Sequence, residues 1–299
     1  MPASDRDRVV VVTDSTASLP ARVVAERGIV VVPLQVVIGA QVYDEVLEED
    51  PSGESGGATP AMVAEALRDF RPVSTSRPTP SALLEVYERA AADGATEIVS
   101  IHLSGEMSGT FESAQLAAKD ASVPVHAVDS RQVGVATGYA ALSAAEAVAA
   151  GGTALDAVEA ARARAARATS LFYVDTLEYL RRGGRIGAAA AIFGGALSVK
   201  PLLKITDGKV ANLEKVRTAG KALNRLEARI LEAAGDAPVD VCVSHLASHD
   251  RAEQLAERLA EELADNLGGR EVWCTEIGAV LGAHVGPGMV AVCVAPLLD

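Results

Sequence analysis

The sequence predicts an α/β protein built from two domains, and three observations support this prediction. At 299 residues the chain is long enough for two hydrophobic cores of ordinary size. Its first half alternates short apolar runs with helical patterns, which is typical of parallel strands joined by helices. Its second half contains a hairpin pattern and several apolar runs, which indicate a mixed sheet. We therefore expect a three-layer parallel-sheet domain over residues 1–168 and a mixed-sheet α/β domain over residues 169–299.

The expected elements of the first half alternate between strands and helices. Strands are expected over residues 8–14, 97–104 and 124–130, with a strand or strand pair over 29–38. The first helix should have Ser18 as its N-cap and end at Gly28. The next two helices begin with a Thr cap, Thr59 or Thr79, followed by Pro at a position where its missing N–H costs nothing.

The middle and second half of the chain continue this pattern. The acidic, Gly-rich and Ser-rich stretch 47–58 should be an exposed loop, and residues 137–168 should form two helices separated at Gly151 and Gly152. Asp207-Gly208 is typical of a hairpin turn between the apolar runs of residues 200–216. Further strands are expected over 238–246, 271–278 and 288–296, with a helix over 248–263.

Composition and charge argue against several classes of protein. The net charge of −13 disfavours binding to nucleic acid or to an anionic membrane surface, because both depend on many Lys and Arg contacts. The three cysteines, Cys242, Cys274 and Cys293, lie far apart in apolar runs, which suits reduced residues of a cytoplasmic protein. No signal peptide or membrane-spanning stretch is visible, so we expect a cytoplasmic protein without stable membrane insertion.

The common catalytic and cofactor motifs are absent from the sequence. It contains no G-x-x-x-x-G-K-[ST] phosphate loop, no G-x-G-x-x-G after a strand, no H-E-x-x-H and no C-x-x-C. Ser108 does not lie in a G-x-S-x-G nucleophile elbow. We therefore expect no metal and no cofactor.

Hydroxyl side chains are concentrated before two expected helices. Ser108 precedes the helix that begins near Thr110, and Thr75 and Ser76 precede the helix capped by Thr79. The free N–H groups and positive dipole end of a helix start suit an anion. If the sheet is parallel, both loops lie at the carboxyl ends of strands, where such folds bind ligands. Simple helix capping is the alternative interpretation.

Other polar residues also have two interpretations. Asp14 and Ser15 end the first expected strand, where they could line a site or only form the turn into the next helix. His284 could be a ligand or a satisfied, partly buried histidine. The arginine patch, comprising Arg181, Arg182 and Arg185, could be a solvated loop or a surface that docks a partner or contacts phosphate.

The ordered set of motifs resembles the DegV family over essentially the whole chain. The motifs are "VTDSTASLP", "TSRPTPSALLEVYE", "SIHLSGEMSGTFESAQLAA", "VDSRQVGVATGY", "FYVDTLEYLRRGGRIG", "SVKPLLKITDGKV" and "HVGPGMVAV". This resemblance implies a two-domain DegV-like fold and a bacterial fatty-acid-binding protein of phospholipid metabolism. One long-chain fatty acid would lie in an apolar tunnel between the domains. The catalytic subunit of a fatty acid kinase would then phosphorylate its carboxylate with ATP.

The resemblance also implies roles for individual residues. The family's carboxylate-binding positions fall on Thr75, Ser76, Ser108 and His284, and the protein would have no catalytic residue of its own. Secondary contacts could come from Asp14, Ser15, Ser104 and Arg77.

Two positions depart from the family pattern. Arg77 stands where the family usually has Gln, and Gly105-Glu106 stands where it tends to have a second serine and a neutral or basic residue. An acidic Glu106 suits a carboxylate site only if its side chain points away.

Two other functions remain open at the level of sequence. One is a small hydrolase or phosphotransferase that uses Asp14, Ser108 and His284. The other is an interaction module in which the arginine patch docks a partner and the crevice binds nothing.

Overall fold

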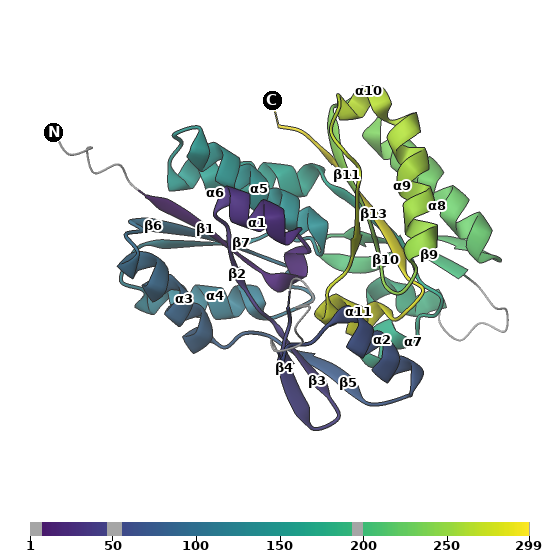
Figure 1. Ribbon diagram of the computed structural model, residues 1–299, viewed down its shortest axis with the longest axis horizontal. Coiled ribbons are helices and arrows are strands. Elements are labelled where there is room, and N and C mark those ends of the chain that lie inside the picture. Colours follow the sequence, from purple (N-terminus) through teal and green to yellow (C-terminus); the bar gives the residue numbers. More distant parts are fainter. Residues whose placement is uncertain (1–7, 47–55, 193–199, 299) are drawn as a thin grey trace.

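The computed structural model describes residues 8–46, 56–192 and 200–298 of the chain. It contains three sheets packed together (Figure 1). Most of the acidic loop expected over 47–58 lies outside the described residues. Within those residues, no helix combines the length and hydropathy required to cross a membrane.

The first sheet is the expected parallel sheet, with strand order β2-β1-β6-β7. Its strands are β1 (Val9–Asp14), β2 (Val30–Val32), β6 (Glu97–His102) and β7 (Val125–Asp129). Val12 and Ile98 face the helices α3 (Pro80–Ala92) and α4 (Thr110–Asp120). Val11 and Val99 face the opposite side, where α5 (Val135–Ala149) and α6 (Ala154–Arg167) pack. This alternation produces the expected three layers (Figure 1).

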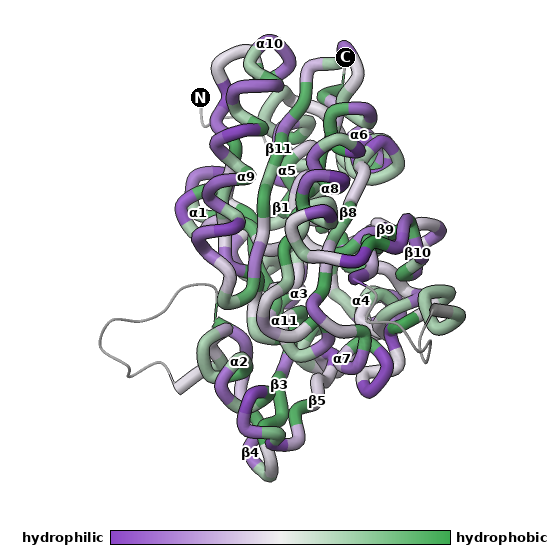
Figure 2. The backbone as a smooth tube through the Cα atoms, turned by 90° about the vertical axis from the view of Figure 1, so that its right-hand side faces the viewer, coloured by the Kyte–Doolittle hydropathy of each residue, from purple (hydrophilic) through white to green (hydrophobic). Residues whose placement is uncertain are grey.

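The second sheet is the expected mixed sheet, with strand order β10-β9-β8-β13-β11-β12. Its strands are β8 (Thr169–Tyr173), β9 (Lys200–Thr206), β10 (Lys209–Val216), β11 (Val239–His245), β12 (Trp273–Glu276) and β13 (Val290–Pro296). Helices α8 (Ala219–Ala234) and α9 (His249–Glu262) share a core with one face of this sheet. Both helices alternate hydrophilic and hydrophobic residues, as expected for helices that cover a sheet (Figure 2). The short α10 (Ala264–Leu267) follows α9.

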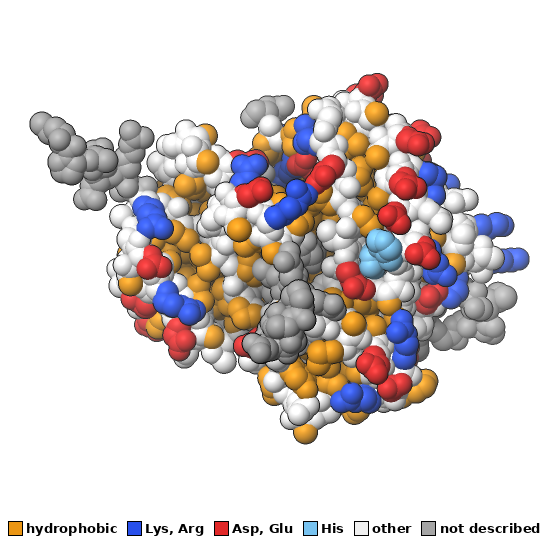
Figure 3. All heavy atoms as spheres, viewed as in Figure 1, with side chains coloured by type: hydrophobic (Ala, Val, Ile, Leu, Met, Phe, Trp, Pro, Cys, Tyr) orange, Lys and Arg blue, Asp and Glu red, His pale blue; other side chains and the backbone are white. Residues whose placement is uncertain are grey.

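A third, antiparallel sheet has no counterpart in the sequence prediction. It comprises β4 (Gln41–Asp44), β3 (Gln35–Ile38) and β5 (Val73–Ser76), in that order. Pro33 separates β2 from β3, so the expected strand pair is divided between two sheets. In Figure 3, hydrophobic side chains are visible on the lower part of the surface, where this sheet lies in Figure 1.

Two helices from opposite halves of the chain pack on the small sheet. Val36 of β3 shares one core cluster with Val63 of α2 (Pro60–Arg68) and Val280 of α11 (Ala279–Val285). The second half of the chain therefore contributes α11 to the core of a sheet that the first half forms. The change from the parallel to the mixed sheet falls between α6 and β8, where the sequence predicts the domain boundary; the boundary at residue 168 stays a prediction.

The helix starts agree with the expected caps at two positions and differ at one. The side-chain oxygens of Thr59 and Thr79 accept hydrogen bonds from the third helical N–H of α2 and α3. Ser18 is not an N-cap: it ends a short 3-10 helix, η1 (Ser15–Ala17), with φ of 51°. The helix α1 (Ala21–Arg27) begins after Pro20 and ends at Gly28 as expected. Asp14 supplies the cap in this region, because its carboxylate accepts from the N–H of Thr16.

The helix α5 packs closely against the turn that follows β1. A Cβ atom on Gly138 would lie 2.6 Å from the carbonyl oxygen of Ala17. Gly220 in α8 has no such neighbour, because nothing lies within 4 Å of its Cβ position.

These two helical glycines should respond to alanine with opposite signs. Gly138→Ala should destabilise the protein by about 1–3 kcal/mol because the added methyl group overpacks the contact. Gly220→Ala should stabilise it by up to about 1 kcal/mol because alanine favours helix. Urea denaturation of both variants would measure the difference, and equal effects would contradict the close packing of α5 on η1.

Candidate functional site

A cavity of about 430 Å³ lies where the three sheets meet. Most of its lining is apolar and comes from loops after β2 and β6, from β8, β9, β10 and β13, and from α11. Apolar lining residues include Leu34, Leu103, Met107, Val133, Val135, Leu171, Phe172, Leu180, Ile205, Val210, Ile277, Leu281, Val285, Met289 and Val292. The cavity therefore has the size and lining of a small-molecule pocket.

The expected head-group residues all line this cavity. Thr75, Ser76, Ser108 and His284 are among its lining residues, as are Arg77 and Arg185. Thr75 and Ser76 lie in β5 of the antiparallel sheet, not at the carboxyl end of a parallel strand. The sequence predicts that the two groups of hydroxyl residues meet at one edge of a parallel sheet. In the structure they approach each other from two different sheets.

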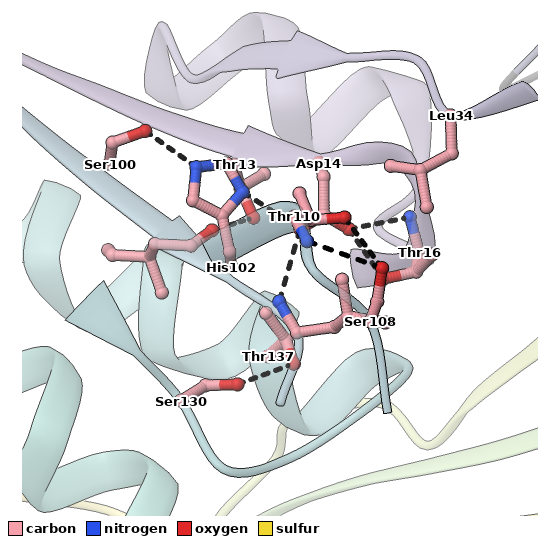
Figure 4. Close-up of polar contacts among 12 residues, drawn as sticks. Thr13, Asp14, Thr16, Leu34, Ser100, His102, Ser108, Thr110, Ser130 and Thr137 are labelled. Carbon is pink, nitrogen blue, oxygen red and sulfur yellow. Dashed lines mark hydrogen bonds and ion pairs between the residues drawn. The ribbon is translucent and has the colours of Figure 1, made fainter. Parts of the chain in front are cut away.

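A buried polar network positions the loop that contains Ser108 (Figure 4). The carboxylate of Asp14 accepts from His102 Nδ1 at 2.9 Å and from the N–H of Leu103 at 3.1 Å. Ser100 Oγ lies 2.8 Å from His102 Nε2, and the hydroxyl of Tyr87 donates to Ser100 at 2.8 Å. One consistent assignment runs from Tyr87 through Ser100 and His102 to Asp14, with the first three groups each donating once and the carboxylate accepting. The ends of β1 and β6 are thereby held together.

The loop after β6 is also attached to the hairpin of the mixed sheet. Ser104 Oγ donates to the carbonyl oxygen of Gly208 in the β9–β10 turn at 2.8 Å. Glu106 pairs with Lys209 across a distance of 2.9 Å. The hydrogen bond to Lys209 lowers the pKa of the Glu106 carboxyl, so this residue is a surface anion directed at the hairpin. Ser104 and Glu106 are not among the residues that line the cavity.

Ser108 lies at the start of α4, where its hydroxyl has a local partner. Its Oγ lies 2.9 Å from Thr110 Oγ1 and accepts weakly from the N–H of Thr110 at 3.4 Å. A side-chain hydroxyl retains further hydrogen-bonding capacity after one such contact. Ser108 can therefore contribute to helix capping and still offer a donor to the cavity.

Thr75 and His284 meet from opposite halves of the chain. Thr75 Oγ1 lies 2.9 Å from His284 Nε2, although 209 residues separate them. His284 Nδ1 is buried and has no hydrogen-bond partner among the described residues. Burial, assisted by the nearby Arg185 charge, lowers the pKa of His284 to about 4. The imidazole is therefore neutral near pH 7.

A buried carboxylate positions the helix that carries His284. Glu45 Oε1 accepts from the N–H of Val280, in the first turn of α11, at 2.7 Å. Burial raises the pKa of this carboxyl, while its hydrogen bonds to Ser15 and Val280 favour the charged form. The first half of the chain thus holds the start of α11 directly.

Two arginines bring positive charge to the cavity. Arg77 forms an ion pair with Glu112 at 3.2 Å and lies against Gly109. Arg185 Nε donates to the carbonyl oxygen of Met107 at 3.0 Å, and its Nη1 donates to that of Gly183. Arg77 and Arg185 therefore contact the residues on either side of Ser108, and both arginines line the same cavity as Ser108 and His284.

The arginine patch is divided between two environments. Arg181 and Arg182 of α7 (Glu178–Arg182) are exposed and pair with Glu178 at 2.8 and 2.6 Å. Arg185 is exposed as well, but it also lines the cavity. The docking role of the three arginines stays a prediction.

Several expected secondary contacts lie elsewhere. Asp14 and Ser15 are buried and do not belong to the cavity lining. Ser15 Oγ accepts from the N–H of Leu34, so it holds the loop between β2 and β3. The hydrogen bonds also pair Asp14 with His102, and His284 with Thr75. No linked triad of Asp14, Ser108 and His284 occurs among the described hydrogen bonds.

Most of the apolar lining has no signal in the sequence. Met107, Val210 and Leu281 come from a loop, a hairpin strand and a helix whose meeting no local pattern indicates. The role of Gly109 is likewise visible only in the structure, because Arg77 occupies the space in which a Cβ atom of Gly109 would lie.

The chain matches the model of the DegV family, described as an uncharacterised protein family, over residues 8–297. The chain belongs to the DegV family. A DegV domain-containing protein of Streptomyces coelicolor is 51% identical over 286 residues, which cover 96% of this chain and 98% of that protein.

Solved structures of DegV proteins have the same fold. A DegV family protein from Thermus thermophilus, described for its fatty acid binding, superposes with a TM-score of 0.86 at 32% identity, over 97% of this chain and 100% of that one. DegV of Bacillus subtilis, described as a fatty acid binding protein, has a TM-score of 0.85 at 31% identity, with coverage of 97% and 99%. The expected α/β architecture, with a parallel sheet in the first half of the chain and a mixed sheet in the second, is therefore confirmed.

The environment of His284 predicts how the stability of this DegV protein depends on pH. Its folded pKa of about 4 lies below the ordinary value of 6.5, so the unfolded chain binds the proton more readily between these values. The neutral imidazole of His284 contributes to the free energy of unfolding, and this contribution is fully present above about pH 6.5. It is lost as the pH falls toward 4, by up to about 3 kcal/mol. Urea denaturation of ligand-free protein at several pH values should show this loss, and His284→Asn should reduce it. An unchanged pH profile in the variant would contradict a buried, neutral His284.

Proposed function

We propose that this protein binds one long-chain fatty acid in the cavity, with the carboxylate held by Thr75, Ser76, Ser108 and His284. The observation that carries the proposal is an apolar cavity with a hydroxyl and histidine cluster at one part of its lining. Arg77 and Arg185 would add positive charge beside the carboxylate. The fatty-acid-binding relatives from Thermus thermophilus and Bacillus subtilis support this assignment.

The physical chemistry of the lining agrees with an acyl ligand. Each buried methylene contributes roughly 0.8 kcal/mol, so about ten of them contribute roughly 8 kcal/mol before the cost of immobilisation. The apolar wall can therefore supply most of the affinity. The head group then requires only a few donors, and hydroxyls provide them without the desolvation cost of a fully buried ion pair.

The second part of the proposal is that the bound carboxylate is presented to a partner. The catalytic subunit of a fatty acid kinase would transfer phosphate from ATP to this carboxylate and form an acyl phosphate. The chain would act as a carrier and not as an enzyme, since its sequence has no recognisable phosphate loop. Hydroxyl and imidazole donors suit this role because they hold the carboxylate in place without forming a direct ion pair with it.

We place this function in the cytoplasm. The three cysteines are free, although Cys242 and Cys293 lie in register on neighbouring strands β11 and β13. Free thiols in this arrangement suit a reducing compartment.

Fatty acid binding can be tested on protein purified from a bacterial host. Mass spectrometry of the denatured protein should detect about one fatty acid per chain. Thr75→Val and Ser108→Ala should each weaken the binding of added fatty acid by about tenfold or more, because each removes a hydrogen bond to a charged group.

Ser74→Ala is the matched control for these variants. Ser74 is an exposed hydroxyl residue beside Thr75 on β5, and it does not line the cavity. Its substitution should leave binding unchanged. Protein that neither retains nor binds long-chain fatty acids would refute the proposal, and esterase turnover abolished by Ser108→Ala would favour a hydrolase instead.

Docking of the kinase can be tested separately from binding of the lipid. Arg182 is an exposed member of the arginine patch, so Arg182→Glu should lower acyl phosphate formation by a fatty acid kinase catalytic subunit and leave fatty acid affinity unchanged. Arg22→Glu is the control, because Arg22 is also exposed and paired with a glutamate, Glu271, but lies on α1. Equal rates for the two variants would exclude Arg182 from the docking surface.

A further inference from the structure

A second cluster of reactive side chains lies outside the cavity and plays no part in the proposed lipid site. It comprises His245 at the end of β11, His249 at the start of α9 and Cys274 in β12. One ligand atom from each residue lies within 4.8 Å of the others. The rings of His245 and His249 have centroids 5.5 Å apart and are inclined by 67°.

Strand register explains why these residues lie together. β11 and β12 are parallel neighbours in which Val243 is opposite Cys274, and His245 is opposite Glu276. Residues two apart on a strand share a face, so His245 and Cys274 point to the same side of the sheet. The helix α9 packs on that side, with Ala252 and Leu255 in the same core cluster as Val243, and its first residue is His249.

The imidazole of His245 provides an independent indication of a ligand. Its side chain is only 7% exposed, and Nδ1 is buried without a hydrogen-bond partner in the described part of the chain. The carboxylate of Glu276 is 3.8 Å away, which is beyond hydrogen-bond distance. A buried polar nitrogen without a partner costs free energy, so this imidazole is a group that a bound ligand would stabilise.

The surroundings provide room and charge for a cation. The cluster borders a polar recess of about 930 Å³, lined also by Asp175, Asp250 and Glu276, and by Arg68 and Arg251. Asp175 is paired with Lys200 at 3.2 Å, so among the lining carboxylates Asp250 and Glu276 carry the local negative charge. Histidine side chains are exposed near the lower end of α9, with acidic side chains beside them (Figure 3).

We propose that His245, His249 and Cys274 bind one Zn²⁺ ion, with water in the fourth position. Imidazole and thiolate are the donors that zinc prefers, whereas Ca²⁺ and Mg²⁺ require mainly oxygen ligands. His249 and Cys274 are exposed, so small rotations of their side chains can bring the three donors to bonding distances of about 2.0–2.3 Å. On binding, the thiol proton of Cys274 passes to solvent.

The sheet separates this site from the lipid cavity. Ser244 lines the cavity, whereas its neighbour on β11, His245, points to the α9 side. A metal there would join the ends of β11 and β12 to the start of α9. The proposal does not depend on fatty acid binding, and loss of the metal should leave fatty acid affinity unchanged.

The sequence motifs did not indicate this site for a specific reason. His245 and His249 lie four positions apart, but they span the end of a strand and the start of a helix. Cys274 follows 25 residues after His249 in the sequence and meets it only through the pairing of β11 with β12.

The test uses untagged, full-length protein treated with a chelator and a reductant. Titration with Zn²⁺ against a chromogenic chelator should give one ion per chain. Cys274→Ser and His249→Ala should each weaken binding by about tenfold or more. Both residues are exposed, so the variants should fold, and circular dichroism would verify this.

A spectroscopic measurement on the unmodified chain keeps the proposal testable even if a variant fails to fold. Co²⁺ bound in place of Zn²⁺ should show a thiolate-to-cobalt charge-transfer band that Cys274→Ser removes. His126→Ala is the control: His126 is partly exposed and paired with Glu97, but it lies on β7, outside the cluster. Absence of stoichiometric Zn²⁺ binding, or equal affinity in the Cys274 and His126 variants, would overturn the proposal.

Discussion

The buried carboxylate of Asp14 is the interaction on which the arrangement of the site depends. It receives hydrogen bonds from Thr16 in the turn after β1, from His102 at the end of β6 and from the N–H of Leu103. An unpaired carboxylate at full burial would be very costly, so these donors must remain in place. The chain therefore leaves β1 and β6 in fixed directions. The chain after β6 forms the loop with Ser108, and the chain after β1 continues through β2 to Leu34.

From this anchor, the cavity is completed by segments that are distant in sequence. Thr75 arrives on the small antiparallel sheet, and His284 arrives on α11, whose start is held by Glu45. The hairpin of β9 and β10 closes against the loop after β6 through Ser104 and Lys209. Each of these connections joins the two halves of the chain, so the cavity lies between them.

Residues of similar type in neighbouring positions have different roles for reasons that only packing explains. Ser104 and Ser108 lie in one loop, but the Ser104 hydroxyl is bonded to the hairpin, whereas Ser108 lines the cavity. Arg182 and Arg185 are both exposed, but only Arg185 also lines the cavity. Glu106, which would be unfavourable beside a bound carboxylate, is directed to Lys209 instead. A local sequence pattern cannot distinguish such cases, because side-chain direction depends on partners elsewhere in the chain.

The sequence by itself determined the parallel sheet, the mixed sheet with its hairpin at Asp207-Gly208, and the Thr-Pro helix starts. These features depend on periodicity and capping within short segments, where neighbouring residues determine the local conformation. Tertiary structure alone decided the separate sheet of β3, β4 and β5, the cavity, and the meeting of His245, His249 and Cys274. Such features depend on the packing of distant segments, because burial of apolar surface is non-directional and leaves no periodic signal of which segments will meet.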